Sequence, residues 1–194
     1  MNYCSHCGEK TRLGVPPGDD RPRFICDHCG RVHYQNPKIV VGTIPEWENR
    51  ILLCRRAIEP RVNRWTLPAG YMENGETAAE GAARETMEEA CARVGDLYPF
   101  AIFDLTFVNQ VYMMYRAPMV DGRCAAGSES REVRLFSESE VPWEDLAFAV
   151  IRRTLECYFD DRSRGRFRLH TGSVVPDHPV SSVNRVTRIG GKSG

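Results

Sequence analysis

The stretch of sequence that decides the fold is "GYMENGETAAEGAARETMEEACARV", residues 70–94. Thr77 is followed three residues later by Glu80, which forms a capping box and predicts that a helix begins at about Ala78. Apolar residues then recur at intervals of three and four, and this spacing predicts the helix face that packs on a sheet. The members of that series are Ala79, Ala83, Met87, Ala90 and Val94.

The same helix carries three glutamates, Glu85, Glu88 and Glu89, and the stretch contains no lysine. At about 100° per residue these side chains are neighbours, on the opposite side of the helix from Met87. Like charges at this spacing cost only about 0.2–0.5 kcal/mol per pair on an exposed helix. Charge alone therefore leaves two interpretations open, a solvated acidic face and a cation site.

The spacing of the charged residues resembles the Nudix box, G-x5-E-x7-R-E-U-x-E-E-x-G-U, in which U is aliphatic. The positions that match are Gly70, Glu76, Arg84, Glu85, Glu88 and Glu89. The segment "WTLPAG" precedes the box as an expected strand and loop, and the resemblance covers roughly residues 38 to 160.

Two positions depart from the box. Thr86 stands where an aliphatic residue is usual, and Cys91 and Ala92 replace the final glycine and aliphatic pair. Neither change removes a ligand. Because cysteine accepts a left-handed helix cap poorly, the absence of the glycine raises the alternative that the helix continues towards Gly95.

The resemblance implies an α/β fold, the Nudix α/β/α sandwich with a mixed sheet, that hydrolyses a nucleoside diphosphate linked to another group. It implies that Glu85, Glu88 and Glu89 bind Mg²⁺ or Mn²⁺, that Arg84 orients Glu85, and that Glu76 assists from outside. Glu85 is also a candidate base. The chemistry agrees, because hard divalent cations prefer carboxylate oxygens, neutralise phosphate charge and acidify a bound water.

Nudix enzymes often recruit a further acid from outside the box. The segment "GSESREVRLF" offers Glu129, in an expected loop, and Glu132, beside an expected strand. A mobile loop could carry a base to a bound water. The sequence leaves the choice between the two open, and a solvated loop charge is the alternative for each.

Four of the eight cysteines lie in the first 29 residues, as two C-x-x-C pairs. Cys4 and Cys7 form one pair, Cys26 and Cys29 the other, and the separation of the pairs is typical of a structural four-thiolate zinc site. Unmetallated thiols or a redox pair are the alternatives. We expect the nearby histidines to lie at the surface or beside the metal, outside the ligand set; they are His6, His28 and His33.

We expect three parts in the chain: a small N-terminal zinc ribbon at residues 1–36, a Nudix domain at 37–180, and a flexible C-terminal tail at 181–194. Within the Nudix part, the expected strands are "KIVVGTI", "ILLCRRA" and "EVRLF", with a hairpin formed by "FAIFDLTFV" and "VYMMYRAPMV". A second helix is expected from Trp143, with a core-facing series of Leu146, Val150, Leu155 and Phe159.

The chain has 26 basic and 26 acidic residues, so it provides no basic field for nucleic acid. No stretch approaches the roughly 18 apolar residues of a membrane span. The N-terminal residues lack the pattern of an export or import signal, and we therefore expect a cytoplasmic protein. The expected partner is a nucleotide substrate, without membrane or nucleic acid. A homodimer is an expectation from the family resemblance alone.

A zinc ribbon before a Nudix box, with "YQNP" at the junction, looks like the pyrophosphatases that act on ADP-ribose and FAD. The branch that hydrolyses NADH carries S-Q-P-W-P-F-P-x-S after the box, and residues 91–141 contain nothing similar. We therefore favour FAD or ADP-ribose. NADH pyrophosphatase activity, and a non-catalytic nucleotide-sensing or nucleic-acid-binding regulator, are the alternatives. The expected hairpin offers aromatic residues for ring stacking, namely Phe103, Phe107, Tyr112 and Tyr115.

Overall fold

The computed structural model describes residues 1–175 of the chain, so the expected tail at 181–194 lies outside the described residues. The chain divides into two compact units, Met1–Pro37 and Lys38 onward. Within the described residues, no helix has the length and apolar character needed to cross a membrane.

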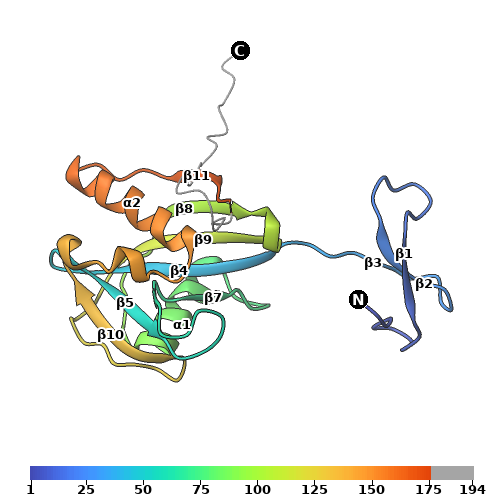
Figure 1. The fold of residues 1–194 in the computed structure, drawn as a ribbon, viewed down its shortest axis with the longest axis horizontal. Helices are drawn as coiled ribbons and strands as arrows, with labels where there is room; N and C mark the ends of the chain where they lie inside the picture. Colours follow the sequence, from blue (N-terminus) through green and yellow to red (C-terminus); the bar gives the residue numbers. More distant parts are fainter. Residues whose placement is uncertain (176–194) are drawn as a thin grey trace, which may run out of the picture. The chain divides into compact units, whose positions relative to one another are not determined.

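The first unit is a small antiparallel sheet in the order β1-β2-β3 (Figure 1). Its strands are β1 (Thr11–Gly14), β2 (Arg23–Cys26) and β3 (Val32–His33). Two cysteines, Cys4 and Cys26, are buried, whereas most of the large apolar side chains are exposed. The exposed ones include Tyr3, Leu13, Val15 and Tyr34. This unit therefore buries very little apolar surface of its own.

The second unit contains a mixed sheet in the order β10-β5-β4-β9-β8-β11. These strands are β4 (Lys38–Trp47), β5 (Arg50–Arg56), β8 (Tyr98–Leu105), β9 (Gln110–Pro118), β10 (Ser130–Phe136) and β11 (His170–Ser173). Strand β4 runs parallel to β9 and β11 runs parallel to β8, while the other pairs on this path are antiparallel. Strands β8 and β9 form the expected hairpin, joined by the 3-10 turn η1 (Thr106–Val108).

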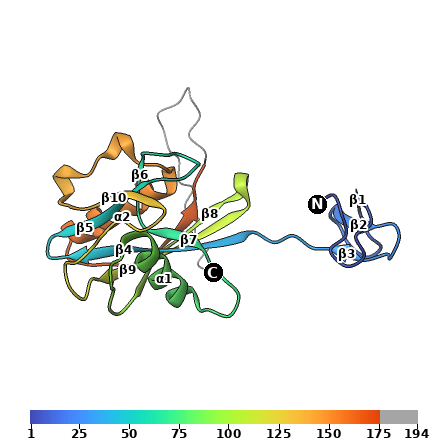
Figure 2. The same cartoon turned by 90° about the horizontal axis from the view of Figure 1, so that it is seen from below.

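Two short strands lie beside this path. Strand β6 (Trp65–Thr66) pairs with β5, and β7 (Ala69–Tyr71) pairs with β4 (Figure 2). Both come from the segment "WTLPAG" and the start of the box. The glycine that opens the box, Gly70, is therefore placed directly beside a central strand.

The sheet lies between two helices, α1 (Ala78–Ala90) and α2 (Ala149–Ser163), as Figure 1 shows. On the α1 side, Val41 and Tyr115 pack with Ala82. On the α2 side, Ile44 and Met114 belong to the main core, together with many residues of that helix. Residues of opposite parity on β4 and β9 thus face opposite helices, as the two-residue repeat of a strand requires. The expected α/β/α sandwich with a mixed sheet is confirmed.

The second helix begins later than the sequence indicates. Trp143–Asp145 forms a separate 3-10 turn, η3, and the helix starts at Ala149. Between them the chain is held in an extended form, because the Ala147 N–H donates to the Trp65 carbonyl at 2.7 Å. The expected start at Trp143 was therefore wrong, since a contact with β6 overrides the local helical pattern.

The packed face of α1 also differs from the expectation. Met87 is 41% exposed, whereas the buried residues of this helix are Gly81, Ala82, Glu85, Thr86, Glu89 and Ala90. Small and polar side chains face the sheet because the helix lies close to it. The Thr86 hydroxyl, fully buried, lies 2.6 Å from the Thr43 hydroxyl of β4. The alanine series was too weakly apolar to define the inward face.

Helix α1 ends at Ala90, and Cys91 adopts the left-handed conformation with φ 46° and ψ 32°. The alternative that the helix continues towards Gly95 was therefore wrong. The loop before β10 covers this end: Ala125 N–H donates to the Ala90 carbonyl at 2.9 Å, and Gly127 N–H donates to the Glu89 carbonyl at 3.0 Å. These tertiary bonds hold cysteine in a conformation that it adopts poorly by itself.

Candidate active site

A cavity of about 850 Å³ lies in the second unit, and several residues of the Nudix box line it. All three box glutamates, Glu85, Glu88 and Glu89, contribute to its lining, and Glu129 does so from the loop before β10. Other parts of the lining come from the first turn of α2, from β9 and from the segment after β5. The cavity therefore brings together acidic groups from α1 and apolar groups from distant parts of the sequence.

Arg84 connects three of the four glutamates of the box. Its Nε and Nη2 donate to the two carboxylate oxygens of Glu76 at 3.0 and 2.9 Å. Its Nη1 donates to Glu85 at 2.8 Å and to Glu88 at 3.0 Å. Hydrogen bonding from Arg84 lowers the pKa of Glu76 to about 2. This geometry suits the roles that the resemblance implies, with Arg84 orienting Glu85 and Glu76 supporting Arg84 from outside the cavity lining.

Glu85 and Glu89 are buried at the base of the cavity. A side chain at Gly70 would overlap the Glu85 carboxylate, so glycine at this position permits the carboxylate to occupy its place. Oε2 of Glu89 is buried and has no hydrogen-bond partner among the described residues. Burial, reinforced by the charge of Glu85, raises the pKa of Glu89 to about 8. Burial also raises the pKa of Glu85, despite the opposing effect of Arg84.

An unpaired buried carboxylate is costly unless a proton or a cation neutralises it. The donor set at this point, carboxylate oxygens open to a water-accessible cavity, suits Mg²⁺ or Mn²⁺, which keep several water ligands. The Nη1 of Arg84 lies within hydrogen-bond distance of both Glu85 and Glu88. In residues 1–175, the tightest group of candidate metal ligands is the four cysteines, and the glutamates are spaced more widely.

The structure separates the two acids that the sequence left undecided. Glu129 lines the cavity, and its charge adds to burial in raising the pKa of both Glu85 and Glu89. Glu132 lies on β10 opposite Arg55, is exposed, forms an ion pair with it at 3.5 Å, and does not line the cavity. Of the two, Glu129 is thus the one that lines the cavity together with the box glutamates.

The loop that carries Glu129 approaches α1 very closely at Gly127. A side chain there would overlap the backbone carbonyl of Glu88. Only a residue without a Cβ allows this approach. Gly127 therefore contributes to the placement of Glu129 beside the box glutamates.

The sequence missed several residues that line the cavity, among them Arg56, Phe148 and Tyr71. The Arg56 guanidinium lies 5.2 Å from the centre of the Phe148 ring. Phe148 comes from the segment that precedes α2, and nothing in the local sequence distinguishes it from a core residue. Tyr71 directly follows the first glycine of the box, and that position could have suggested a place near the site.

The expected aromatic series divides between the cavity and the core. Tyr112 and Phe107 line the cavity. Phe103 is buried in the main core, and Tyr115 is buried on the α1 side of the sheet. Tyr115 points to the opposite face of the sheet from Tyr112, because side chains alternate along a strand. Phe103 is the register partner of Tyr112 on β8, but it is buried in the core. Two of the four rings are therefore available for stacking.

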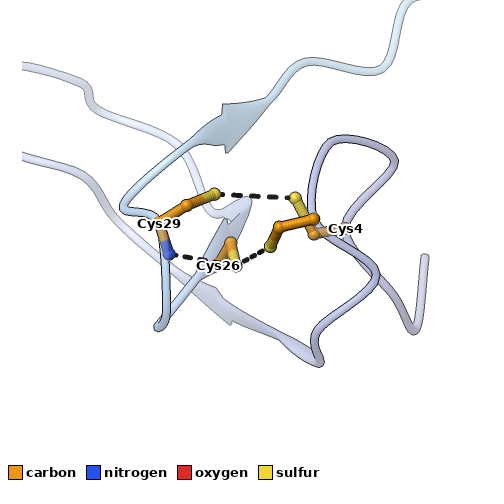
Figure 3. A group of neighbouring side chains, drawn as sticks. Cys4, Cys26 and Cys29 are labelled. Carbon is orange, nitrogen blue, oxygen red and sulfur yellow. Dashed lines mark hydrogen bonds between the residues drawn. The ribbon is translucent and has the colours of Figure 1, made fainter.

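The four cysteines of the first unit converge on one point. Their Sγ atoms all lie within 4.8 Å of one another, with Cys4 to Cys29 at 3.8 Å and Cys7 to Cys26 at 3.5 Å (Figure 3). Zn–S bonds of about 2.3 Å in a tetrahedron would place sulfurs at roughly this separation. The thiols are free of disulfides. This donor set therefore fits a single structural Zn²⁺.

Two equivalent turns present these sulfurs. Gly8 and Gly30 have φ of 78° and 71°, and their N–H groups donate to the carbonyls of Cys4 and Cys26 at 2.9 Å. Nε2 of His33 lies 3.2 Å from the Cys4 sulfur, so this histidine sits beside the group as expected.

The family comparisons agree with this architecture. Residues 37–156, more than half of the chain, match the NUDIX domain family, and residues 2–35 match the zinc ribbon family described as Nudix N-terminal. The fold and the box define a Nudix protein with an N-terminal zinc ribbon. The chain belongs to the Nudix hydrolase family.

A solved structure of a NUDIX hydrolase from Nitrosomonas europaea is 51% identical, with a TM-score of 0.84, and covers 89% of this chain and 99% of that chain. Curated relatives are named NAD-capped RNA hydrolase NudC. The protein from Vibrio atlanticus is 26% identical over 83% of this chain and 58% of its own length. The one from Salmonella heidelberg is 33% identical over 79% of this chain and 58% of its own length. The chain thus spans just under three fifths of these two relatives.

Proposed function

We propose that this chain is a Mg²⁺- or Mn²⁺-dependent pyrophosphatase that cleaves the diphosphate linkage of a nucleoside diphosphate joined to another group. The observation that carries the proposal is a buried oxygen of Glu89 that has no partner in the described part of the chain and belongs to a cavity shared with Glu85, Glu88 and Glu129. The cavity lining holds six glutamates and three arginines, so its excess of negative charge repels an anionic substrate unless cations accompany it. A diphosphate bound together with divalent cations meets that requirement.

The residues would divide the work as follows. Glu85, Glu88 and Glu89 hold the cation, which supplies neutralisation of the phosphates and a more acidic water. Arg84 keeps Glu85 and Glu88 in place through its hydrogen bonds, and Glu76 keeps Arg84 in place. Glu129 accepts a proton from the water that attacks one phosphorus. The P–O bond to the bridging oxygen breaks, and the two products leave as phosphate monoesters.

The favoured substrates are FAD, which would give FMN and AMP, and ADP-ribose, which would give AMP and ribose 5-phosphate. A cavity of about 850 Å³ is large enough for a substrate with groups at both ends of a diphosphate. Tyr112, Phe107 and Phe148 in its lining offer surfaces for flat rings. The absence of the S-Q-P-W-P-F-P-x-S motif argues against the NADH branch.

A second candidate is an NAD-linked diphosphate. The curated relatives are named NAD-capped RNA hydrolases, and that name favours NADH or an NAD-capped RNA over FAD and ADP-ribose. An RNA-bearing substrate would also make nucleic acid a partner of this chain, contrary to the expectation drawn from its zero net charge. The zinc ribbon, with one Zn²⁺ on its four cysteines, is proposed to be structural under either candidate.

A substrate panel tests the proposal directly. We would compare kcat/KM for FAD, ADP-ribose, NADH, an NAD-capped RNA oligonucleotide and ATP, each with Mg²⁺ and with Mn²⁺. The expected result is highest kcat/KM for FAD or ADP-ribose and little turnover of ATP. Preference for NADH or the capped RNA would establish the second candidate. Binding without turnover of any substrate would favour the nucleotide-sensing alternative.

A further inference from the structure

Three large apolar side chains line the cavity but remain about half exposed, so they lie where it opens to solvent. They are Tyr71 at 49%, Phe107 at 48% and Val108 at 46% exposure. Neither the carboxylate chemistry nor the core accounts for them. When a ligand covers apolar surface that was open to water next to a binding site, the free energy of the complex is lowered.

Tyr71 is held in position from two sides. Nε2 of Gln110 on β9 donates to its hydroxyl at 2.9 Å. The ammonium group of Lys38 on β4 lies 4.6 Å from the centre of its ring. An exposed tyrosine ordinarily samples several rotamers, and fixing it in the free protein reduces the entropy lost on binding. The ring is therefore preorganised at the cavity mouth.

The Tyr71 ring is the first member of a row of side chains that crosses the sheet into the cavity. Val40 of β4 is the register partner of Tyr71 on one side and of Tyr112 on the other. All three residues line the cavity. Tyr71 is exposed and Tyr112 is partly buried. The row therefore forms a surface that leads from solvent into the interior.

The same ring is adjacent to the acidic residues. Gly70, the preceding residue, lies against the Glu85 carboxylate, and the Tyr71 carbonyl accepts a hydrogen bond from Arg84 Nη2 at 3.2 Å. A group bound at the mouth is thus close enough to be joined covalently to a diphosphate at the glutamates.

We propose that Tyr71, Phe107 and Val108 form a ring-binding subsite, preorganised by Gln110 and Lys38, for the flat aromatic group on the non-adenosine end of the substrate. This inference rests on the proposed pyrophosphatase function and refines it. A dinucleotide with a ring at each end, such as FAD, gains contacts that ADP-ribose lacks, because ADP-ribose ends in a sugar. The subsite therefore selects for the flavin dinucleotide over ADP-ribose.

Steady-state kinetics of Phe107→Ala with FAD and with ADP-ribose tests the subsite. The ratio of kcat/KM for FAD to that for ADP-ribose should fall about tenfold, mainly through KM for FAD, which corresponds to about 1.4 kcal/mol. Gln110→Ala should lower the ratio by a smaller factor, since it frees the Tyr71 hydroxyl and removes one polar side chain from the lining but leaves the three apolar side chains in place. Tyr98→Ala is the matched control, because Tyr98 is 50% exposed on β8 and does not line the cavity. It should leave the ratio unchanged.

Equal losses of kcat/KM for FAD and ADP-ribose would assign the mouth to the adenine that both contain and would overturn the proposal. Unchanged kcat/KM for both compounds would overturn it as well. If the wild type hydrolyses neither compound, FAD and ADP-ribose are excluded as substrates, and calorimetric titration with each compound then tests the subsite independently of turnover. The subsite then requires that FAD bind more tightly than ADP-ribose, and that Phe107→Ala remove this difference. Absence of FAD binding would overturn it. Circular dichroism of each variant verifies folding.

Discussion

The two units of the chain build their sites in opposite ways. In Met1–Pro37, four sulfurs from two tight turns converge within 4.8 Å, while large apolar residues such as Leu13 and Tyr34 stay exposed. From Lys38 onward, the carboxylates stand on a helix packed against a sheet whose residues, such as Leu52 and Leu53, are fully buried. The ribbon buries little apolar surface, so we expect a metal on its four cysteines to stabilise the fold. In the Nudix unit, the fold stabilises a site of mutually repelling charges.

The largest expected effect comes from breaking the thiolate site. Cys26→Ser should abolish zinc binding and unfold the ribbon, because a structural zinc contributes on the order of 10–16 kcal/mol to such a small unit. The wild type should contain one zinc per chain. Metal analysis measures the zinc, and hydrogen–deuterium exchange should show lost protection in the ribbon with protection retained in the Nudix unit.

Cys91→Ser serves as the control for that substitution, because Cys91 is exposed and lies outside the four-sulfur group. It should keep its zinc. A wild-type preparation without zinc, in which the ribbon is fully protected and all four thiols react freely, would contradict the structural-zinc assignment.

The next effect comes from the carboxylate site. Glu89→Gln should lower turnover by about 100-fold or more, because the cation loses a charged ligand while little packing changes. Glu88→Gln should act in the same direction. Glu156→Gln on α2, which does not line the cavity, is the control and should turn over normally. Unaltered metal-dependent turnover in both variants would exclude this face of α1 as the catalytic metal site.

The same substitution should change the pH dependence of stability in the absence of divalent cations. The pKa of Glu89 rises from an ordinary 4.5 to about 8 in the folded protein. A carboxyl group with a raised folded pKa supports folding below its unfolded pKa and loses that contribution as the pH rises through its folded value. Glu89→Gln should therefore gain stability relative to the wild type as the pH increases through this interval. Urea unfolding at several pH values measures the difference, and a constant difference would contradict the burial argument.

Glu129 and Glu132 give a sharper comparison within the Nudix unit. Glu129→Gln should lower kcat by about 10²-fold or more, as expected for loss of a general base. Glu132→Gln removes only an exposed pair with Arg55 and should change kcat less than about twofold and stability by less than about 1 kcal/mol. Parallel kinetic and denaturation measurements separate the two. Similar kcat losses in both variants would refute the assignment of Glu129.

The smallest expected effect concerns the threonine pair between α1 and β4. Thr86→Val leaves the fully buried Thr43 hydroxyl without its partner and should cost about 1–3 kcal/mol. Thr43→Val combined with Thr86→Val removes both hydroxyls and should recover most of that loss. Denaturant unfolding of the single and double variants provides the test. A double variant as unstable as the sum of its parts would show that the hydroxyl pair does not couple these elements.

Much of the candidate site could be predicted because it depends on short-range spacing. The start of α1 is an example: Thr77 accepts from the Glu80 N–H at 3.2 Å, and the Thr77 N–H donates to Glu80 at 2.7 Å. The placement of Glu85, Glu88 and Glu89 on neighbouring positions follows from helix geometry alone. The turns at Gly8 and Gly30 are equally local. In each case the interacting groups are within a few residues of one another.

The inward face of α1, its end and the start of α2 were not predictable in this way. Met87 is exposed because the close contact with β4 admits only small and polar side chains, and Cys91 caps the helix because the loop at 125–127 bonds to its last turn. The start of α2 is set by a bond to Trp65. Each outcome is decided by a partner that is distant in sequence.

By itself, the amino-acid sequence determined the family pattern, the two groups of candidate metal ligands and the helix that bears the acidic group, because these depend on residue type and local spacing. Only the tertiary structure decided that one Glu89 oxygen is buried without a partner within residues 1–175, that Glu129 rather than Glu132 lines the cavity, and that Tyr71 and Phe148 belong to its lining. Burial and neighbourhood depend on which segments pack together, and a strand register or a loop contact sets them across tens of residues.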